Sequence, residues 1–410
     1  MKKAIVLAGT DDHIRLIEIL KNRGYYTILV DMADDTPAKP YADSFAQIST
    51  RDMESVLNFA KGESIDLIIT GCGDTTMPTM AYVAGKMKLT TPFDYETAIN
   101  VTNKERMKKK MVNAGIPTSE YTVFENIEEL ENINLEYPLI VKPPDGNGSA
   151  GIKKVNSFNE LVHFAKEALE VSKTGRGVIE KYIHGLEVNI DAFIGDEDVD
   201  ILMYGHVRKR ILNDNVNLIF QTIIPADISK KAVDNIELII KMIAKEFNLK
   251  NTPILLQTII NGDDVNVIEF SPRIGGASKH KTIKEVTGFD MLNALVDSFL
   301  NKPVEVFSEK NPMFYSRNHI YAQPGIFGRV SNIDYLMSNG IIEEFSFFKT
   351  KGMEIGENYA SKDRIGSFLV KAGSKSELME KIKLAVSKME VFDIDDTPIM
   401  KKEIFEGEIF

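Results

Sequence analysis

Residues 254–276, ILLQTIINGDDVNVIEFSPRIGG, decide the fold class of this chain. Two runs rich in Ile, Val and Leu flank the turn-forming residues 261–264, so the stretch predicts a β-hairpin. A three-residue loop at 262–264 places Gln257 across from Glu269 on one face, whereas an even loop points the two side chains to opposite faces. We therefore predict the odd loop.

The polar side chains of this hairpin are typical of a metal–phosphate site. Glu269 offers a carboxylate and Gln257 an amide oxygen, and Mg²⁺ commonly takes one or two carboxylates together with water and substrate phosphate oxygens. Ser271 adds a hydroxyl and Arg273 a guanidinium. A Gln/Glu pair on its own is more often a solvated hairpin face. The interpretation therefore depends on the other motifs of the chain.

A lysine followed by a glycine-rich loop lies at residues 138–152, PLIVKPPDGNGSAGI. A short apolar strand leads to Lys142, and the glycines of residues 145–151 let backbone N–H groups approach an anion closely. The lysine precedes the glycines, so this is not the GxxxxGK[ST] loop. Taken alone, the segment is more often a plain surface hairpin tip.

Two further segments carry charged residues, one on a pair of predicted strands and the other at the start of a predicted helix. In residues 178–191, VIEKYIHGLEVNID, Glu180 and Glu187 lie on two strands that a turn separates. Lys104 opens an amphipathic helix that ends at Gly115. The lysine run of this helix would ordinarily be a solvated face.

Taken in order, these motifs resemble the ATP-grasp superfamily, in which ligases join a carboxylate to an amine. Four elements in the expected order over about 170 residues are more specific than any one of them. The flanking segments extend the resemblance over nearly the whole chain, to carbamoyl-phosphate synthase large chains, L-amino acid ligases and phosphoribosylglycinamide synthetase. The opening residues LAGTDDH differ from the LxxGxGGREHA-like opening of that synthetase.

The resemblance implies a role for each motif residue. The implied ATP-binding residues are Lys104, Lys142, Gly146, Gly148, Ser149, Gly151, Glu180, Lys181, Ile183 and Glu187. The implied metal ligands are Gln257, Glu269 and Ser271, and the implied catalytic residues are Arg273 and Lys142. Most relatives carry Asn at the position of Ser271, so a contact through water is the alternative for this hydroxyl. Arg317 and Arg329 lie where related ligases bind a substrate carboxylate.

The function that follows from the resemblance is an ATP- and Mg²⁺-dependent ligase, with Mn²⁺ as the alternative ion. It would form a carbon–nitrogen bond through an acyl phosphate and release ADP and phosphate. The alternatives are a phosphoribosylglycinamide synthetase-type ligase, an ATP-grasp kinase and a non-catalytic ATP sensor. The sequence leaves open which carboxylate and which amine are the substrates.

Composition is compatible with a globular enzyme. The 410 residues carry 49 basic and 60 acidic side chains, a net charge of −11, which disfavours nucleic acid or an anionic membrane as a partner. The apolar start is cut short by residues 10–13, so we expect no leader and a cytoplasmic location. Cys72, the single cysteine, excludes an internal disulfide. A homodimer is compatible with the resemblance.

The expected fold class is α/β. Short β runs alternating with helical patterns in residues 1–96 indicate a Rossmann-like parallel sheet that precedes the ATP-grasp domain. Residues 97–310 would form the ATP-grasp α+β domain, with a flap subdomain at about 125–182. Residues 311–410 would complete the fold of that domain.

Overall fold

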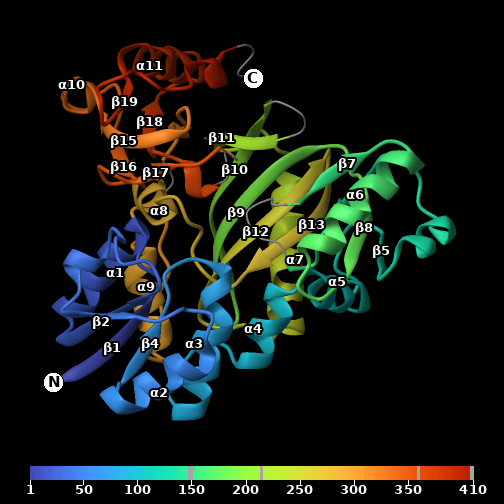
Figure 1. Ribbon diagram of the computed structural model, residues 1–410, viewed down its shortest axis with the longest axis horizontal. Helices are drawn as coiled ribbons and strands as arrows, with labels where there is room; N and C mark the ends of the chain where they lie inside the picture. The colour runs from blue at the N-terminus through green and yellow to red at the C-terminus, as the bar shows by residue number, and fades with distance from the viewer. Residues whose placement is uncertain (146–150, 213–215, 310, 358–360, 407–410) are drawn as a thin grey trace.

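The computed structural model describes residues 1–145, 151–212, 216–309, 311–357 and 361–406. The chain begins with a four-stranded parallel sheet of order β3-β2-β1-β4 (Figure 1). Its strands are β1 Lys2–Leu7, β2 Tyr25–Asp31, β3 Ser44–Gln47 and β4 Leu67–Ile69, and its helices are α1 Asp11–Asn22, α2 Met53–Glu63 and α3 Met77–Met87. The parallel sheet confirms the predicted α/β start of the chain.

An eight-stranded antiparallel sheet forms the centre of the molecule, with order β13-β12-β9-β10-β11-β14-β18-β16. Its strands are β9 Leu186–Ile194, β10 Val199–Leu212, β11 Val216–Ile224, β12 Thr252–Asn261, β13 Asp264–Ser271, β14 Phe314–Ile320, β16 Glu344–Phe347 and β18 Gly366–Ala372. The amphipathic helix α7 Lys230–Glu246 packs on β9, β10 and β13. Because β14, β16 and β18 follow residue 310, the last quarter of the chain completes this sheet, as predicted.

The hairpin of β12 and β13 has the predicted pairing but not the predicted loop. Asn261 pairs with Asp264 across a two-residue loop, in which Gly262 adopts a left-handed conformation with φ of 61°. With this even loop and a regular ladder, the Gln257 side chain would point to the face of the hairpin opposite that of Glu269. A β-bulge between Gln257 and Thr258 shifts the register by one residue, so Gln257 pairs with Glu269 and Thr258 with Val267. The three-residue loop was wrong, and the bulge restores the common face.

A smaller subdomain projects from the central sheet (Figure 1). Its sheet has the order β5-β8-β6-β7, with a separate hydrophobic core beneath helix α6. The elements are β5 Tyr121–Phe124, η3 Ile127–Asn132, β6 Leu139–Lys142, β7 Lys153–Val155, α6 Phe158–Val171 and β8 Gly177–Lys181. Helices α4 Tyr95–Thr102 and α5 Lys104–Asn113 connect the N-terminal sheet to this subdomain.

The remaining elements link and cover the two large sheets. Helix α9 Met291–Phe299 packs against α1, β4 and β12, and α8 Lys279–Thr287 packs against α9 and β10. A fourth sheet has the order β17-β15-β19 and shares one hydrophobic core with β18 and α11, and α11 packs on β18. The elements of this part of the chain are β15 Gly325–Val330, α10 Ile333–Ser338, β17 Glu354–Ile355, α11 Lys375–Lys388 and β19 Val391–Asp393. Besides η3, the described residues form the short 3-10 helices η1 Lys39–Tyr41, η2 Asp74–Thr76, η4 Ser361–Asp363 and η5 Lys402–Phe405.

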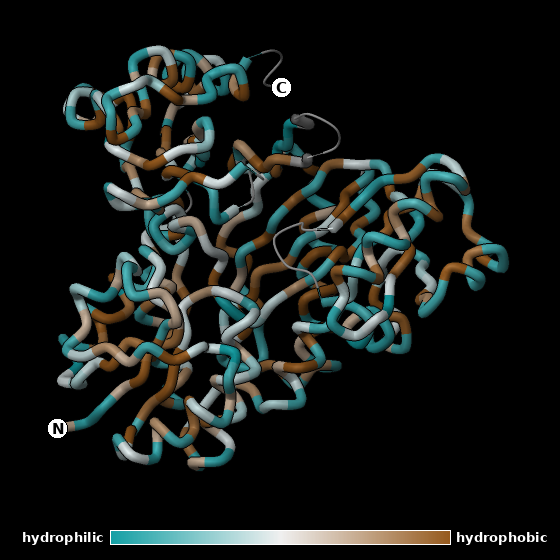
Figure 2. The backbone as a smooth tube through the Cα atoms, in the orientation of Figure 1, coloured by the Kyte–Doolittle hydropathy of each residue, from teal (hydrophilic) through white to brown (hydrophobic). Residues whose placement is uncertain are grey.

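One hydrophobic core joins the N-terminal sheet to the central sheet, and a second lies under α11. Hydrophobic residues follow the strands of both sheets, whereas the helices alternate between hydrophobic and hydrophilic residues (Figure 2). At the β13 edge of the central sheet, the Val267 amide donates to the Pro117 carbonyl at 2.8 Å, so the segment before β5 covers part of this edge.

Candidate functional site

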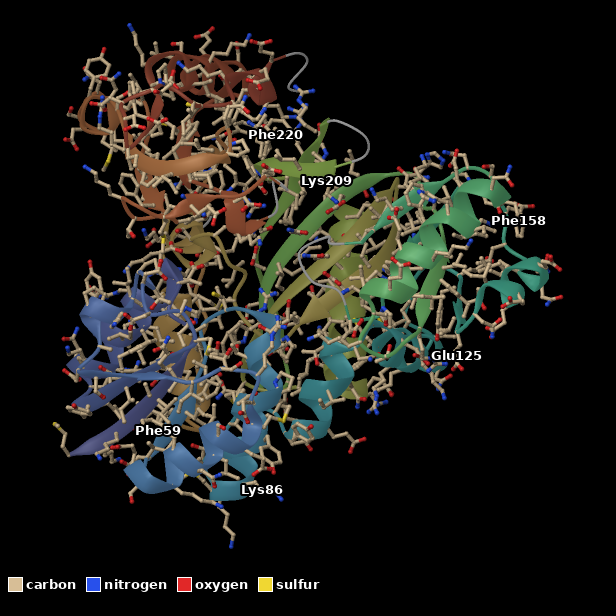
Figure 3. All side chains as sticks on the ribbon, in the orientation of Figure 1. Phe59, Lys86, Glu125, Phe158, Lys209 and Phe220 are labelled. Carbon is tan, nitrogen blue, oxygen red and sulfur yellow. The ribbon has the colours of Figure 1, made fainter. Side chains whose placement is uncertain are left out.

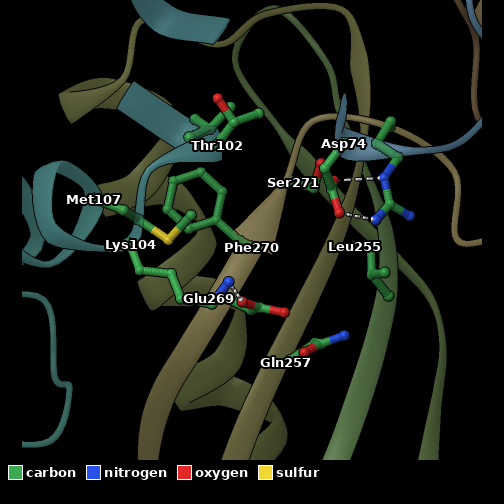
Figure 4. Close-up of a pocket in the computed structure, with 11 residues that line it drawn as sticks. Asp74, Thr102, Lys104, Met107, Leu255, Gln257, Glu269, Phe270 and Ser271 are labelled. Carbon is green, nitrogen blue, oxygen red and sulfur yellow. Dashed lines mark hydrogen bonds and ion pairs between the residues drawn. The ribbon is translucent and has the colours of Figure 1, made fainter. Parts of the chain in front are cut away.

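A pocket lies at the end of the β12–β13 hairpin, where the N-terminal sheet, α4, α5 and the central sheet meet. Its lining comes from four parts of the chain: Asp74, Val101, Thr102, Lys104, Met107, Leu255, Gln257, Glu269, Phe270, Ser271 and Arg273 (Figure 4). Five of these are predicted site residues. The structure therefore brings Lys104, the first motif residue along the chain, together with the last motif, residues 257–273.

Gln257 and Glu269 lie side by side on one face of the hairpin (Figure 4). The Lys104 Nζ atom lies 3.3 Å from Glu269 Oε2. Lys104 is the first residue of α5, whose N-cap Asn103 accepts a hydrogen bond from the Arg106 amide. The backbone amide of Lys104 also donates to the carbonyl of Pro144 at 3.0 Å. This bond ties the start of α5 to the segment that follows Lys142.

Arg273 is held by a carboxylate that the sequence interpretation missed. The Arg273 Nε and Nη2 atoms each donate to Asp74 at 2.8 Å, in a bidentate pair. The Ser271 hydroxyl donates to the same carboxylate at 2.7 Å. Burial raises the pKa of Asp74, but the charge and hydrogen bonds of Arg273 outweigh burial and lower it to about 2. Ser271 is thus bound to Asp74 and is not placed beside Gln257.

A second cluster of charges includes Lys142 at the end of β6. The Lys142 Nζ atom lies 2.5 Å from Glu180 Oε1, and Lys108 Nζ lies 3.3 Å from the same oxygen. Ser119 donates to the other oxygen of Glu180 at 2.9 Å. Burial raises the pKa of Glu180, but the charges of Lys142 and Lys108 outweigh it, so the pKa is lowered. Two cations and one anion leave this buried cluster with net positive charge.

Lys108 is the second residue that sequence reasoning missed, because it belongs to a lysine run that predicted a solvated face. Its side chain is only 1% exposed. Burial and the nearby Lys142 lower its pKa to about 8, although Glu180 raises it. The available signal was the spacing of four residues from Lys104, since residues i and i+4 share one face of a helix.

The predicted ribose-binding residue, Glu187, lies on the same sheet as the predicted metal ligands. Glu187 of β9 forms an ion pair of 2.5 Å with Lys209 of β10. Lys209 is labelled in Figure 3. The turn before it requires glycine, because Gly185 has a φ of 156° and a Cβ atom there would lie 2.4 Å from the carbonyl oxygen of Ile260. The turn thus brings β9 closely alongside β12.

The other predicted nucleotide-binding residues lie around these clusters. Lys181 ends β8 with a half-exposed side chain that approaches Glu136 at 3.9 Å, and Ile183 follows it in the connection to β9. Gly151 adopts a left-handed conformation with φ of 73°. Gly146, Gly148 and Ser149 lie outside the described residues.

Two arginines considered for a substrate carboxylate lie outside the pocket. Arg317 is buried and donates to Thr282 and Glu344. Arg329 pairs with Asp396 at 2.9 Å on an exposed surface. Cys72 is buried, and burial raises the pKa of its thiol well above the usual value. This favours the interpretation of Cys72 as a packed side chain.

Within the described part of the chain, no group of three or more His, Cys, Asp or Glu residues is arranged to hold a metal ion. Apart from the Asp74 carboxylate, which is paired with Arg273, the pocket offers the Glu269 carboxylate and the Gln257 amide. This donor set fits Mg²⁺, which completes its coordination with water and phosphate oxygens.

In the same described ranges, no helix is long and apolar enough to cross a membrane.

Comparison with known proteins supports the predicted resemblance. Residues 135–281 match the model of the ATP-grasp domain. A carbamoyl phosphate synthase large chain from Thermoanaerobacter sp. (strain X514) is 24% identical over 404 residues, which cover 95% of this chain and 36% of the relative. The chain thus spans about a third of that relative's length.

Solved structures share the fold over nearly the whole chain. A phosphoribosylglycinamide synthetase from Anaerococcus prevotii superposes with a TM-score of 0.76 at 22% identity, covering 96% of this chain and 99% of that one. An L-amino acid ligase from Bacillus licheniformis gives a TM-score of 0.79 at 19% identity, with 96% and 99% coverage. Residues 135–281 therefore carry an ATP-grasp domain, and the chain as a whole has the fold of these solved structures.

Proposed function

We propose that this protein is an ATP- and Mg²⁺-dependent ligase that joins a carboxylate to an amine through an acyl phosphate. The observation that carries the proposal is the convergence of Lys104, Gln257, Glu269 and Arg273 on one pocket. Metal-facing oxygens and phosphate-directed cations are the groups that phosphoryl transfer needs, and an attacking carboxylate needs no side-chain nucleophile.

The nucleotide would lie across the face of the central sheet. Glu187 would accept hydrogen bonds from the ribose, and the main chain of residues 180–183 would contact the adenine. The Glu180 side chain is turned into the Lys142–Lys108 cluster, which supports a main-chain role for this segment. Lys142 and Lys104 would bind the phosphates, with the net positive charge of the cluster adding to their attraction.

Glu269 and Gln257 would hold Mg²⁺, which when bound neutralises charge on the phosphates. Ser271 would act by orienting Asp74, because its hydroxyl hydrogen is given to that carboxylate. Asp74 in turn fixes the plane of the Arg273 guanidinium through two hydrogen bonds. A third N–H donates to the carbonyl of Ile274 at 2.9 Å. Two of the five guanidinium N–H groups then remain to bind the transferred phosphoryl group.

The reaction follows from these positions. A substrate carboxylate oxygen attacks the γ-phosphorus of ATP, the bond from that phosphorus to the bridging oxygen breaks, and ADP leaves. The amine then attacks the acyl carbon, loses a proton, and displaces phosphate. Lys142 and Arg273 would stabilise the charge that builds on the phosphoryl oxygens in the first step.

We also assign the parts of the chain by role. Residues 1–96 would contact the substrate, residues 97–310 would bind the nucleotide with a flap at about 125–182, and residues 311–410 would complete the fold. The separate hydrophobic core of the small subdomain supports a flap that moves as a unit.

A trapping experiment tests the proposal. The protein is incubated with MgATP, pools of carboxylic acids and hydroxylamine, and hydroxamates are detected by mass spectrometry alongside nucleotide products. A ligase gives a hydroxamate with ADP and phosphate. A kinase would give a stable phosphoester instead, and an ATP sensor would bind the nucleotide without turnover. Either of the latter two results contradicts the proposed function.

A further inference from the structure

The segment that carries Arg273 continues into an unusual turn before helix α8. Residues 274–278 connect Arg273 to α8, and both Ala277 and Ser278 adopt left-handed conformations, with φ of 62° and 60°. A side chain with a Cβ atom makes this conformation unfavourable. In the described structure, the Ser278 side chain makes no capping hydrogen bond for α8. The turn therefore depends on partners from another part of the chain.

The partner is Asp12, the second residue of helix α1 in the N-terminal domain. Its carboxylate accepts hydrogen bonds from the Ala277 amide at 3.1 Å and from the Ser278 amide at 2.9 Å. The start of α1 thus meets the start of α8 (Figure 1). The His280 Nδ1 atom lies 3.3 Å from the same carboxylate. Asp12 is only 5% exposed, so these contacts are shielded from water.

The Asp12 carboxylate is charged in this position. Burial raises the pKa of Asp12, but the hydrogen bond and charge of His280, together with the Ser278 amide, outweigh burial, so the pKa is lowered. A charged acceptor forms stronger hydrogen bonds with backbone N–H groups than a neutral acceptor does. Asp12 therefore stabilises the left-handed turn that its two amide partners form.

Two more carboxylates hold the same segment at its ends. Asp74 binds the guanidinium of Arg273 through two hydrogen bonds. Asp191 of β9 pairs with Lys279 at 3.2 Å. Asp74 and Asp191 bind side chains, whereas Asp12 binds the backbone that lies between these two anchors. The course of the main chain after Arg273 thus depends on Asp12.

Asp12 and Asp74 also belong to one part of the N-terminal domain. The Cys72 thiol donates to Asp12 at 3.6 Å, and Asp74 follows Cys72 by two residues. The same edge of the N-terminal domain therefore holds both the guanidinium of Arg273 and the turn that follows it.

We propose that Asp12 is a positioning residue for phosphoryl transfer, which holds residues 274–278 in the conformation that aims the two remaining N–H groups of Arg273 into the pocket. This inference rests on the proposed ligase function, in which Arg273 binds the transferred phosphoryl group. Asp12 acts through Arg273, so it is not itself a catalytic residue. Because a displacement of about 1 Å can cost about 10²-fold in rate, loss of this anchor lowers kcat and leaves ATP binding intact.

Two measurements on the intact protein test the anchor. Amide hydrogen exchange of residues 274–280, followed by mass spectrometry, reports on the turn and needs no substrate. Hydroxamate formation from MgATP, pooled carboxylic acids and hydroxylamine gives the turnover at saturating ATP and the KM for ATP. Asp12→Asn is compared with the control Asp43→Asn, because Asp43 also accepts a backbone amide in the N-terminal domain, that of Thr27 at 2.8 Å.

Asp12→Asn should speed exchange within residues 274–280 and lower turnover at saturating ATP at least about tenfold, because hydrogen bonds to a charged acceptor are lost. The KM for ATP should stay nearly unchanged. Asp43→Asn should alter neither the exchange of this segment nor the turnover. Equal turnover of the two variants, or unchanged exchange in Asp12→Asn, overturns the positioning role.

Glycine at position 277 provides a rescue that a general loss of stability would not show. Because glycine adopts the left-handed conformation without a steric penalty, adding Ala277→Gly to Asp12→Asn should recover about fivefold in turnover. Ala277→Val should lower turnover with Asp12 intact, since a β-branched residue is strained at a φ of 62°. This variant keeps the test available if Asp12→Asn does not fold. No recovery in the double variant, or wild-type turnover of Ala277→Val, overturns the proposal.

The two readouts separate the anchor from the proposed function. Faster exchange in Asp12→Asn, together with no hydroxamate from any variant or from wild type, supports the anchored turn and contradicts the ligase function. Hydroxamate formation that Asp12→Asn leaves unchanged supports the ligase function and overturns the positioning role.

Discussion

The net stabilisation of the ionised Asp74 carboxylate by its surroundings, Arg273 above all, should be about 2.5 kcal/mol, and the substitution Asp74→Asn measures it. The pKa of Asp74 falls from the usual 3.8 to about 2, and each pKa unit corresponds to about 1.36 kcal/mol of differential interaction. Asparagine keeps the shape of the side chain but removes the charge that pairs with the buried guanidinium. We expect a loss of roughly 2 kcal/mol in apparent unfolding free energy at neutral pH.

A double-mutant cycle isolates this pair from other effects of each substitution. Urea unfolding of wild type, Asp74→Asn, Arg273→Gln and the double variant gives the coupling energy, which we expect to be about 2 kcal/mol. A matched control pairs exposed residues, Arg329→Gln with Asp396→Asn, for which a coupling of at most about 1 kcal/mol is expected. A coupling below about 0.5 kcal/mol for Asp74 and Arg273 would refute the reasoning.

The pH dependence has a definite sign. The pKa of Asp74 in the folded protein lies below its ordinary value, so the stabilisation is fully present above pH 3.8 and is lost as the pH falls toward about 2. The difference between wild type and Asp74→Asn should therefore be constant at neutral pH and shrink in strong acid. A difference that grows on acidification would contradict the assignment.

Three catalytic predictions concern the proposed ATP-binding and metal-binding residues. Lys142→Ala should fold but lose on the order of 10² in turnover at saturating ATP, because its charge would stabilise the transferring phosphoryl group. The control Lys166→Ala, at an exposed position of α6, should keep most activity, and equal steady-state rates of the two variants would exclude this role of Lys142. Glu187→Gln should raise the KM for ATP with little change in kcat, since ribose hydroxyls are bound alike in the ground and transition states; a normal KM with a collapsed kcat would contradict it. Glu269→Ala should abolish Mg²⁺-dependent turnover, while Gln257→Glu should remain active with an altered Mg²⁺ or Mn²⁺ preference. Turnover of both variants is measured against metal concentration. An active Glu269→Ala variant together with an inactive Gln257→Glu variant would refute the metal-ligand assignment.

The sequence predicts the fold class well, because the relevant signals are local. Alternating β and helical patterns indicate the parallel sheet, and the apolar runs of 254–270 indicate the hairpin. The pairing of Gln257 with Glu269 was predicted correctly for an incorrect reason. A β-bulge, and not a longer loop, brings the side chains to one face, and a bulge inside an apolar run has no distinctive local sequence.

The two missed site residues show what local patterns cannot reveal. Asp74 follows β4 of the N-terminal sheet and meets Arg273, 199 residues later in the chain, only through the packing of two sheets. Lys108 lies in a lysine run whose local interpretation is a solvated face, and it is buried because the small subdomain covers that side of α5. The place of each residue in the site depends on contacts between distant parts of the chain, which a local sequence pattern does not contain.

Trapping the acyl phosphate is the most direct test of the central claim. The purified protein, MgATP, the acid identified from the pooled screen and hydroxylamine are combined, and hydroxamate, ADP and AMP are quantified by chromatography coupled to mass spectrometry. The proposed ligase predicts hydroxamate and ADP in equal amounts, phosphate as the second product, and no AMP. Formation of AMP and pyrophosphate would show that the carboxylate is adenylated, and it would contradict the acyl-phosphate mechanism proposed for this pocket.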